Sequence, residues 1–125
     1  MATAITLTVD PADNNSFEGK GRKFVNQIYA ATSIPLLAKG AALQFFSYAQ
    51  LTGAMTINAA TTIGNLTQGD LVIFLFEADG TERVVTFGTG FKSSGTVTVT
   101  AAKGATCLGV FDGTSVKIVA REIYA

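Results

Sequence analysis

Short apolar runs separated by clusters of small and polar residues fill the second half of the chain. The candidate strands between residues 69 and 122 are Leu71–Phe76, Arg83–Phe87, Thr96–Thr100, Ala105–Phe111 and Val116–Val119. The first run is too short for an isolated helix and is rich in β-branched and aromatic residues. We therefore interpret it as a strand that is covered on both faces. The run Thr96–Thr100 alternates polar and apolar residues with period two, as strands do.

Two Asp-Gly pairs stand between these candidate strands. Glycine takes the positive φ that a tight primed turn requires, so Asp79-Gly80 and Asp112-Gly113 each predict a β-hairpin. Consecutive hairpins join neighbouring strands of one sheet. The pattern therefore predicts an up-and-down antiparallel meander over residues 69–122.

The N-terminal part has weaker signals. Ile5, Leu7 and Val9 alternate with small or polar residues, which predicts a strand or an arm that pairs with a neighbour's sheet edge. Turn-forming residues follow, so residues 1–16 are expected to form this arm and a loop. The apolar spacing in Phe24–Ala31 fits a helix or a strand, and Pro35 favours extended structure.

Two further strands are expected before the meander. One lies in Ala41–Gln50, and the other includes Met55 and Ile57, with Thr61–Gln68 as the connection. The sequence predicts an all-β fold, a single antiparallel β-sandwich or jelly-roll-like barrel with an extended N-terminal arm. No linker or low-complexity tail divides it, so residues 1–125 are expected to form one domain.

The low content of charged residues and the high mean hydropathy indicate that part of the protein surface is buried against other subunits. Charged residues make up 14% of the 125 residues, against about 25% in an average soluble domain, and the mean hydropathy is +0.38. Lys39 interrupts the best candidate membrane span, Ile34–Leu51, and Met1–Val9 lacks the basic start of a signal peptide. A compact monomer is the alternative, but we favour an oligomer or a subunit of a larger assembly.

Charge gives little direction to binding. The net charge is zero, so no global field attracts nucleic acid or an anionic membrane, and neither is an expected partner. The one basic cluster, Lys20 to Lys23, is either a solvated loop, which we favour, or a grip on an acidic neighbour or a phosphate backbone. Cys107 has no partner for a disulfide and is expected to pack as a small apolar residue. The candidate assembly contacts are Ile5, Leu7, Val9, Lys20, Arg22 and Lys23.

Residues suited to catalysis are scarce. The chain has no histidine, which excludes imidazole-based triads and the common zinc sites. Gly88–Ser93 lacks the spacing of a phosphate-binding loop and predicts a β-turn. Glu77, Asp79 and Glu82 are candidates for a calcium site or a glycosidase pair, but a solvated hairpin tip explains them better. We expect no enzyme activity, no cofactor and no metal.

The C-terminal half resembles a small β-domain that recurs in virion proteins of tailed bacteriophages. The similarity begins with a Gly-Asp-led apolar strand followed by Asp-Gly-Thr, and it closes with Phe-Asp-Gly-Thr at residues 111–114. Between them lies a segment matching Arg-x-Val-Thr-Phe-Gly-Thr-x-Phe-Lys, at Arg83, Val85, Thr86, Phe87, Gly88, Thr89, Phe91 and Lys92. The chain lacks a fibre shaft, which favours a compact accessory protein.

The resemblance implies a structural role. Such proteins decorate or cement a phage capsid, form head fibres or sit on tail parts, commonly as homotrimers. The expected function is therefore capsid decoration. The resemblance implies a homotrimer of the chain that binds the major capsid protein or another virion protein. The protein would be made in the bacterial cytoplasm and reside on the virion. The alternative is a tail- or head-fibre-associated module that binds a receptor or carbohydrate, with Tyr29, Tyr48 and Tyr124 as aromatic platforms.

Overall fold

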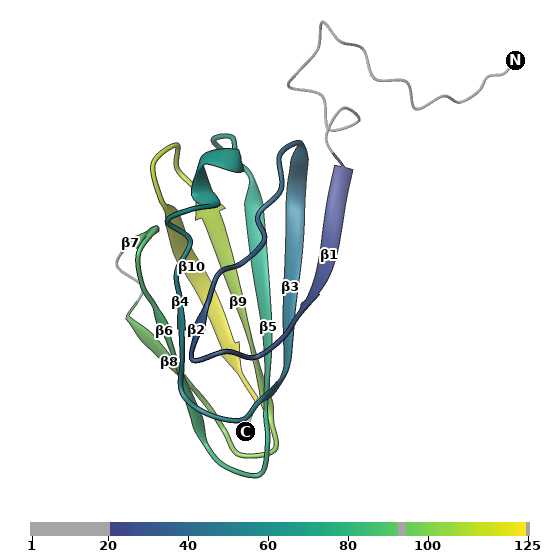
Figure 1. Ribbon diagram of the computed structural model, residues 1–125, viewed down its shortest axis with the longest axis vertical. Coiled ribbons are helices and arrows are strands. Elements are labelled where there is room, and N and C mark those ends of the chain that lie inside the picture. Colours follow the sequence, from purple (N-terminus) through teal and green to yellow (C-terminus); the bar gives the residue numbers. More distant parts are fainter. Residues whose placement is uncertain (1–20, 93–94, 125) are drawn as a thin grey trace, which may run out of the picture.

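The computed structural model describes residues 21–92 and 95–124 as two stacked β-sheets (Figure 1). Sheet A contains, in spatial order, β1 (Gly21–Gln27), β3 (Ala41–Leu51), β5 (Leu71–Ala78), β9 (Gly104–Phe111), β10 (Val116–Ile123) and β7 (Phe91–Lys92). Sheet B contains β2 (Thr32–Ser33), β4 (Met55–Ile57), β6 (Arg83–Phe87) and β8 (Thr96–Val99). The short 3-10 helix η2 (Ile63–Asn65) lies in the β4–β5 connection. The predicted all-β, two-sheet fold is confirmed.

The first six strands wind between the two sheets. Odd-numbered strands β1, β3 and β5 lie side by side in sheet A, and even-numbered strands β2, β4 and β6 lie side by side in sheet B. All four of these neighbouring pairs are parallel. The chain therefore forms three successive turns, each with one strand in either sheet, as in a short β-solenoid.

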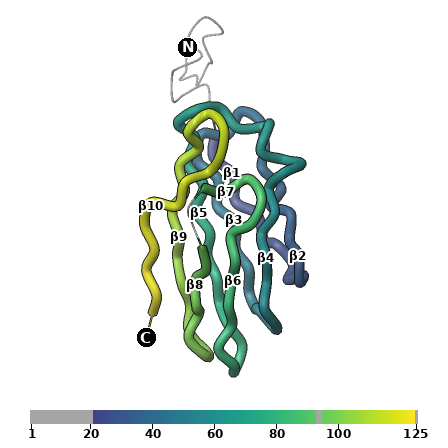
Figure 2. The backbone as a smooth tube through the Cα atoms, turned by 90° about the vertical axis from the view of Figure 1, so that its left-hand side faces the viewer, coloured from purple at the N-terminus to yellow at the C-terminus, as the bar shows by residue number. Residues whose placement is uncertain are grey.

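The last strands reverse this pattern. β8 pairs antiparallel with β6, and β9 pairs antiparallel with both β5 and β10. In Figure 2, β10 lies at the left margin of the molecule and β2 at the right. The sheets are thus mixed, and the prediction of a wholly antiparallel sandwich is wrong for β1–β3–β5, β2–β4–β6 and the β7–β10 pair.

The meander predicted over residues 69–122 is wrong, because the chain changes sheet between β5 and β6 and again between β8 and β9. Asp79-Gly80 joins β5 in sheet A to β6 in sheet B, so these strands stack across the core and do not pair. Both flanks of β5 are taken by β3 and β9. The physical reason is that Phe74 and Phe87 face each other between the sheets, with ring centroids 5.7 Å apart. Burying both rings favours stacking over a hairpin.

The second predicted hairpin is confirmed. Asp112-Gly113 lies in the tight connection between β9 and β10, where Gly113 has φ of +102°. The Asp112 carboxylate accepts hydrogen bonds from the backbone N–H groups of Thr114 and Ser115, at 2.9 and 2.8 Å. These bonds lower the pKa of Asp112, because they favour its ionised form.

The remaining strand predictions hold in outline. Phe24–Ala31 is extended as far as Gln27, within β1; Ala41–Gln50 falls within β3, and Met55 and Ile57 bound β4. The arm predicted for residues 1–16 lies outside the described residues.

One core lies between the sheets. The Phe74 ring sits at its centre, with centroids 5.7 to 6.1 Å from those of Phe46, Phe76, Phe87 and Phe91. Gln44 on β3 is fully buried, and three hydrogen bonds to the backbone of Ala38 and Ala41 satisfy its side chain, at 2.8 to 3.1 Å. Within the described residues, no buried side-chain nitrogen or oxygen lacks a hydrogen-bond partner.

Candidate functional site

The outer face of sheet A carries partly exposed apolar side chains across its central strands. In β5 and β9, burial alternates residue by residue, so every second side chain points away from the core. Several outward positions on the neighbouring strand β3 and on β1 are also apolar. This apolar face consists of Phe24, Leu43, Phe45, Leu71, Ile73, Leu75, Leu108 and Val110. None of the eight belongs to the buried core cluster or packs against it.

Strand register arranges these side chains in rows across the sheet. The central row runs Phe24, Phe45, Ile73, Leu108 and Ala120, each paired with the next on the neighbouring strand. Within it, the rings of Phe24 and Phe45 stack with centroids 6.0 Å apart. Phe24 is nonetheless 58% exposed. The row gives the face a continuous apolar centre five strands wide.

A second row lies on one side of the central row and carries cations at both ends. It runs Arg22, Leu43, Leu71, Val110 and Lys117. Arg22 and Lys117 are exposed, on β1 and β10 respectively. Apolar side chains therefore fill the middle of this row, and positive charge marks its two ends.

A third row lies on the other side and ends in a carboxylate. It runs Asn26, Ser47, Leu75, Thr106 and Glu122. On β10, Lys117 and Glu122 thus stand on opposite sides of Ala120. Along β10, the apolar centre is therefore flanked by a positive charge on one side and a negative charge on the other.

The outer face of sheet B has a different composition. Thr32, Thr56, Thr86 and Thr96 pair in one row across all four strands. Val84 is the large apolar side chain on this face, and it is 38% exposed. Threonine combines a β-branched shape, which suits strands, with a hydroxyl that water can solvate. This face is chemically suited to solvent.

The sequence-predicted assembly contacts are only partly described. Arg22 and Lys23 lie on strand β1, so the interpretation of this basic cluster as a loop is wrong, although both side chains are exposed. With Phe24 and Phe45 they line an open depression of about 310 Å³. Ile5, Leu7, Val9 and Lys20 lie outside the described residues.

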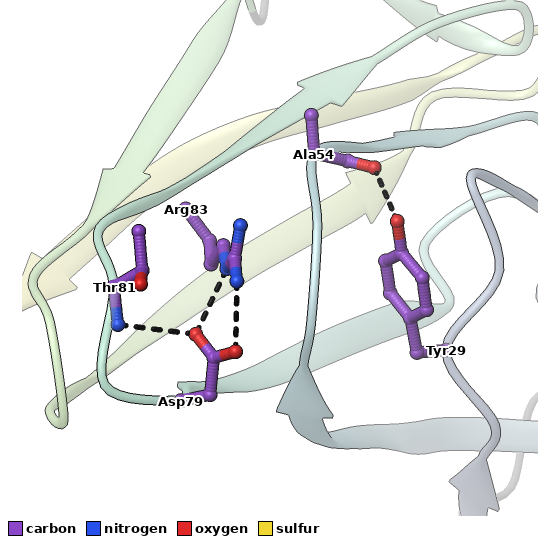
Figure 3. Close-up of polar contacts among 5 residues, drawn as sticks. All are labelled: Tyr29, Ala54, Asp79, Thr81 and Arg83. Atoms are coloured by element: carbon purple, nitrogen blue, oxygen red, sulfur yellow. Dashed lines mark hydrogen bonds and ion pairs between the residues drawn. The ribbon is translucent and has the colours of Figure 1, made fainter.

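The three carboxylates around Asp79 are not arranged as a common site. Both carboxylate oxygens of Asp79 accept hydrogen bonds from Arg83, each at 2.8 Å, and Oδ1 also accepts one from the N–H of Thr81 (Figure 3). The Arg83 guanidinium lowers the pKa of Asp79. Glu77 precedes them on the outer side of β5. No cluster of three or more metal-ligating side chains occurs within residues 21–92 and 95–124.

The three tyrosines proposed as platforms for carbohydrate binding differ in exposure and in their contacts. Tyr48 is fully buried, its hydroxyl 3.0 Å from Ser33 Oγ, so its assignment as an exposed platform is wrong. Tyr29 packs on Gly53 and donates a hydrogen bond to the carbonyl of Ala54 at 2.9 Å (Figure 3). Tyr124 is 47% exposed, with its hydroxyl 2.8 Å from Thr106 Oγ1.

Two smaller predictions are confirmed. Cys107 is a free thiol on β9 whose side chain is buried in the core, where desolvation raises its pKa to about 11. The Gly88–Phe91 segment is a tight turn, closed by a hydrogen bond from the N–H of Phe91 to the carbonyl of Gly88 at 3.2 Å.

The apolar face was missed as a site by sequence reasoning, although one signal for it was present. Leu71–Phe76 contains six consecutive apolar residues and led to the prediction of a strand covered on both faces. Within the described residues, inner side chains such as Phe74 are fully covered, whereas Ile73 and Leu75 are covered only in part. The strand has the sequence of a doubly covered element, but the described part of the chain fully covers one side of it.

Comparison with known proteins adds no relative. No protein-family model matches the chain, and no curated protein matches it. Of the helices in the described ranges, none has the length and apolar content needed to cross a bilayer.

Proposed function

We propose that this chain is a structural virion protein, most plainly a capsid decoration protein of a tailed bacteriophage, which acts by burying surface against other subunits and not by catalysis. The apolar face of sheet A carries this proposal. A chain that places eight apolar side chains on one outer sheet face has a surface suited to association.

The outer edge of β1 supports attachment to a second partner. Among the described strands, β1 is the outermost of sheet A and pairs with β3 alone. Unpaired N–H and C=O groups on such an edge accept an added strand. Arg22 and Lys23 would supply the charge for an acidic neighbour, such as a segment of the major capsid protein. In this proposal the arm at residues 1–16 reaches toward the particle.

Particles of the encoding virus test this function. We expect antibody against the chain to label the outside of the head, and particles lacking it to release DNA at a lower temperature. Adding the purified protein back should restore the wild-type temperature. Particles of unchanged stability that do not rebind the protein would contradict capsid decoration.

A receptor- or carbohydrate-binding module is the second candidate. The depression lined by Arg22, Lys23, Phe24 and Phe45 favours it, because two cations beside two rings suit an acidic sugar. A glycan array should then show acidic glycans retained by the wild type and lost by Phe24→Ala. Label on the tail instead of the head would also favour this candidate over decoration.

A further inference from the structure

We propose that the apolar face of sheet A is the interface with a second copy of this chain. The two copies pack face to face about a twofold axis that lies in the interface, perpendicular to the strands, and passes along the central row. Each copy then presents the same surface to the other, as an isologous dimer requires.

The sequence of β5 indicates a cover on this face. Its residues Leu71 to Phe76 are apolar on both sides of the strand. Such continuous apolar runs are typical of strands that are buried on both faces of a sheet. Sheet B covers one face of β5, and the other exposes Leu71, Ile73 and Leu75 in part. A second copy packed on this side would bury the outward apolar side chains of β5 as well.

The area is sufficient for a dimer. Five strands spaced about 4.8 Å apart, each contributing about five residues of 3.3 Å, give a footprint of roughly 400 Å² in projection. Side chains stand up from the sheet, so two copies would bury on the order of 1,000 Å² in total, at the lower limit of specific interfaces. We therefore expect a dissociation constant in the micromolar range.

Charge decides the orientation of the two copies. With the axis perpendicular to the strands, the second row of one copy lies over the third row of the other. Lys117 then lies opposite Glu122 of the second copy, and the symmetry makes this pair twice. With the axis along the strands, Lys117 would instead lie near the cation Arg22. Opposite charges attract and like charges repel at such distances, which favours the perpendicular axis.

The central row also suits this arrangement. Under the perpendicular axis, Phe24, Phe45, Ile73 and Leu108 each lie near their own counterparts, so the widest apolar row is buried against itself. Leu71 in the second row lies opposite Leu75 in the third. Sheets packed face to face cross at about 30°, a rotation that long rim side chains accommodate.

This inference rests on the proposed function only in that both use association through sheet A. A dimer measured in solution does not depend on the particle, and particle binding through the β1 edge does not depend on the dimer. Failure of one therefore leaves the other standing.

The mass of the full chain in solution is the first test. Sedimentation equilibrium between 1 and 200 µM should show reversible conversion from 13.0 kDa to twice that mass. A monomer at all concentrations, or a trimer, would overturn the twofold interface.

A matched pair of variants locates the interface. Leu108→Glu places a charge in the central row, and we expect the dissociation constant to rise at least 100-fold. Val84→Glu places the same charge on the outer face of sheet B, and should change it less than twofold. Circular dichroism checks that both remain folded. Dissociation by Val84→Glu alone would overturn the assignment of the face.

Charge reversal at the rim tests the orientation and disturbs no apolar side chain. Lys117→Glu turns both pairs into repulsive ones, so the dissociation constant should rise about tenfold. Glu122→Lys should act in the same direction, and the double variant should return to within about threefold of the wild type. A tighter dimer with Lys117→Glu would overturn this orientation, because the alternative places that residue near Arg22.

The remaining test concerns a different occupant, residues 1–16 of the chain itself. Serine replacing Ile5, Leu7 and Val9 in the full chain should leave the dimer intact. Loss of the dimer in this variant while Leu108→Glu has no effect would assign association to the arm and overturn the proposal.

Discussion

The outer faces of the two sheets both begin from three parallel strands, yet they differ in surface chemistry. Sheet A presents leucine, isoleucine and phenylalanine around Ile73 and Leu108, whereas sheet B presents the threonine row that includes Thr56 and Thr86. Both sheets bury their inner faces in one core. The difference shows that a strand's core side and its outer side have separate requirements: the inner face stabilises the fold, and the outer face determines whether the sheet meets water or a partner.

The largest expected effect sharpens the contrast between the two sides of one strand. Phe74 on β5 is fully buried among four rings, so Phe74→Ala should lower the free energy of unfolding by about 3–5 kcal/mol. Its neighbour Ile73 points outward, and Ile73→Ala should lower it by less than about 1 kcal/mol in the monomer. Urea denaturation at low protein concentration measures both. Equal losses would mean that the outer face is covered within one chain.

Giving sheet A the chemistry of sheet B should remove self-association without unfolding the protein. Threonine keeps the β-branched shape of strand residues, so a chain with Leu71→Thr, Ile73→Thr and Leu108→Thr should remain folded. Its dimer dissociation constant should rise about 100-fold, by the loss of apolar surface from the interface. Light scattering measures the mass, and circular dichroism measures the fold. Unchanged mass would show that apolar character on this face does not cause association.

Alkaline pH tests the burial of two ionisable side chains in the core, Cys107 and Tyr48. Burial raises the pKa of Cys107 from 9.0 to about 11 and that of Tyr48 from 10.0 to about 12. The unfolded chain loses these protons at lower pH than the folded chain, so the free energy of unfolding should fall as pH rises from 9 to 12. Cys107→Ala should flatten the fall between pH 9 and 11, and Tyr48→Phe the fall between 10 and 12. A thiol of Cys107 that reacts freely with a water-soluble reagent at pH 8 would contradict its burial.

The smallest effect is expected from the converse substitution on sheet B. Thr56→Leu with Thr86→Leu makes two adjacent positions of the threonine row apolar. The free energy of unfolding should change by less than about 1 kcal/mol, because both positions remain on the surface. Solubility in ammonium sulfate should fall, while the dimer of the wild type persists. A new oligomer of defined size would show that any apolar patch on this sandwich is enough for specific pairing.

Strand positions were readable from the sequence where local pattern alone decides them. β5 and β9 follow from short apolar runs, and the turn at Asp112-Gly113 follows from a glycine that takes positive φ. The buried, inert state of Cys107 follows from its apolar neighbours. Each of these depends on a few residues that are close together along the chain.

The pairing of strands was not readable in the same way. Asp79-Gly80 has the composition of a hairpin turn, yet it connects the two sheets, because Phe74 and Phe87 bury their rings against each other. A tyrosine such as Tyr48 can serve as an exposed surface for carbohydrate binding, yet β3 places its side chain in the core, beside Ser33. In both cases a contact between distant segments overrides a local signal.

The sequence by itself determined that this chain is built of strands, that it has few charges, and that β5 is apolar on both sides. Only the tertiary structure decided that parallel winding places the second apolar side of β5 beside those of β3 and β9 on one outer face, with Lys117 and Glu122 at its rim. The physical reason is that period-two alternation fixes which side chains share a face of one strand. Which strands lie next to each other depends on long-range burial of the core.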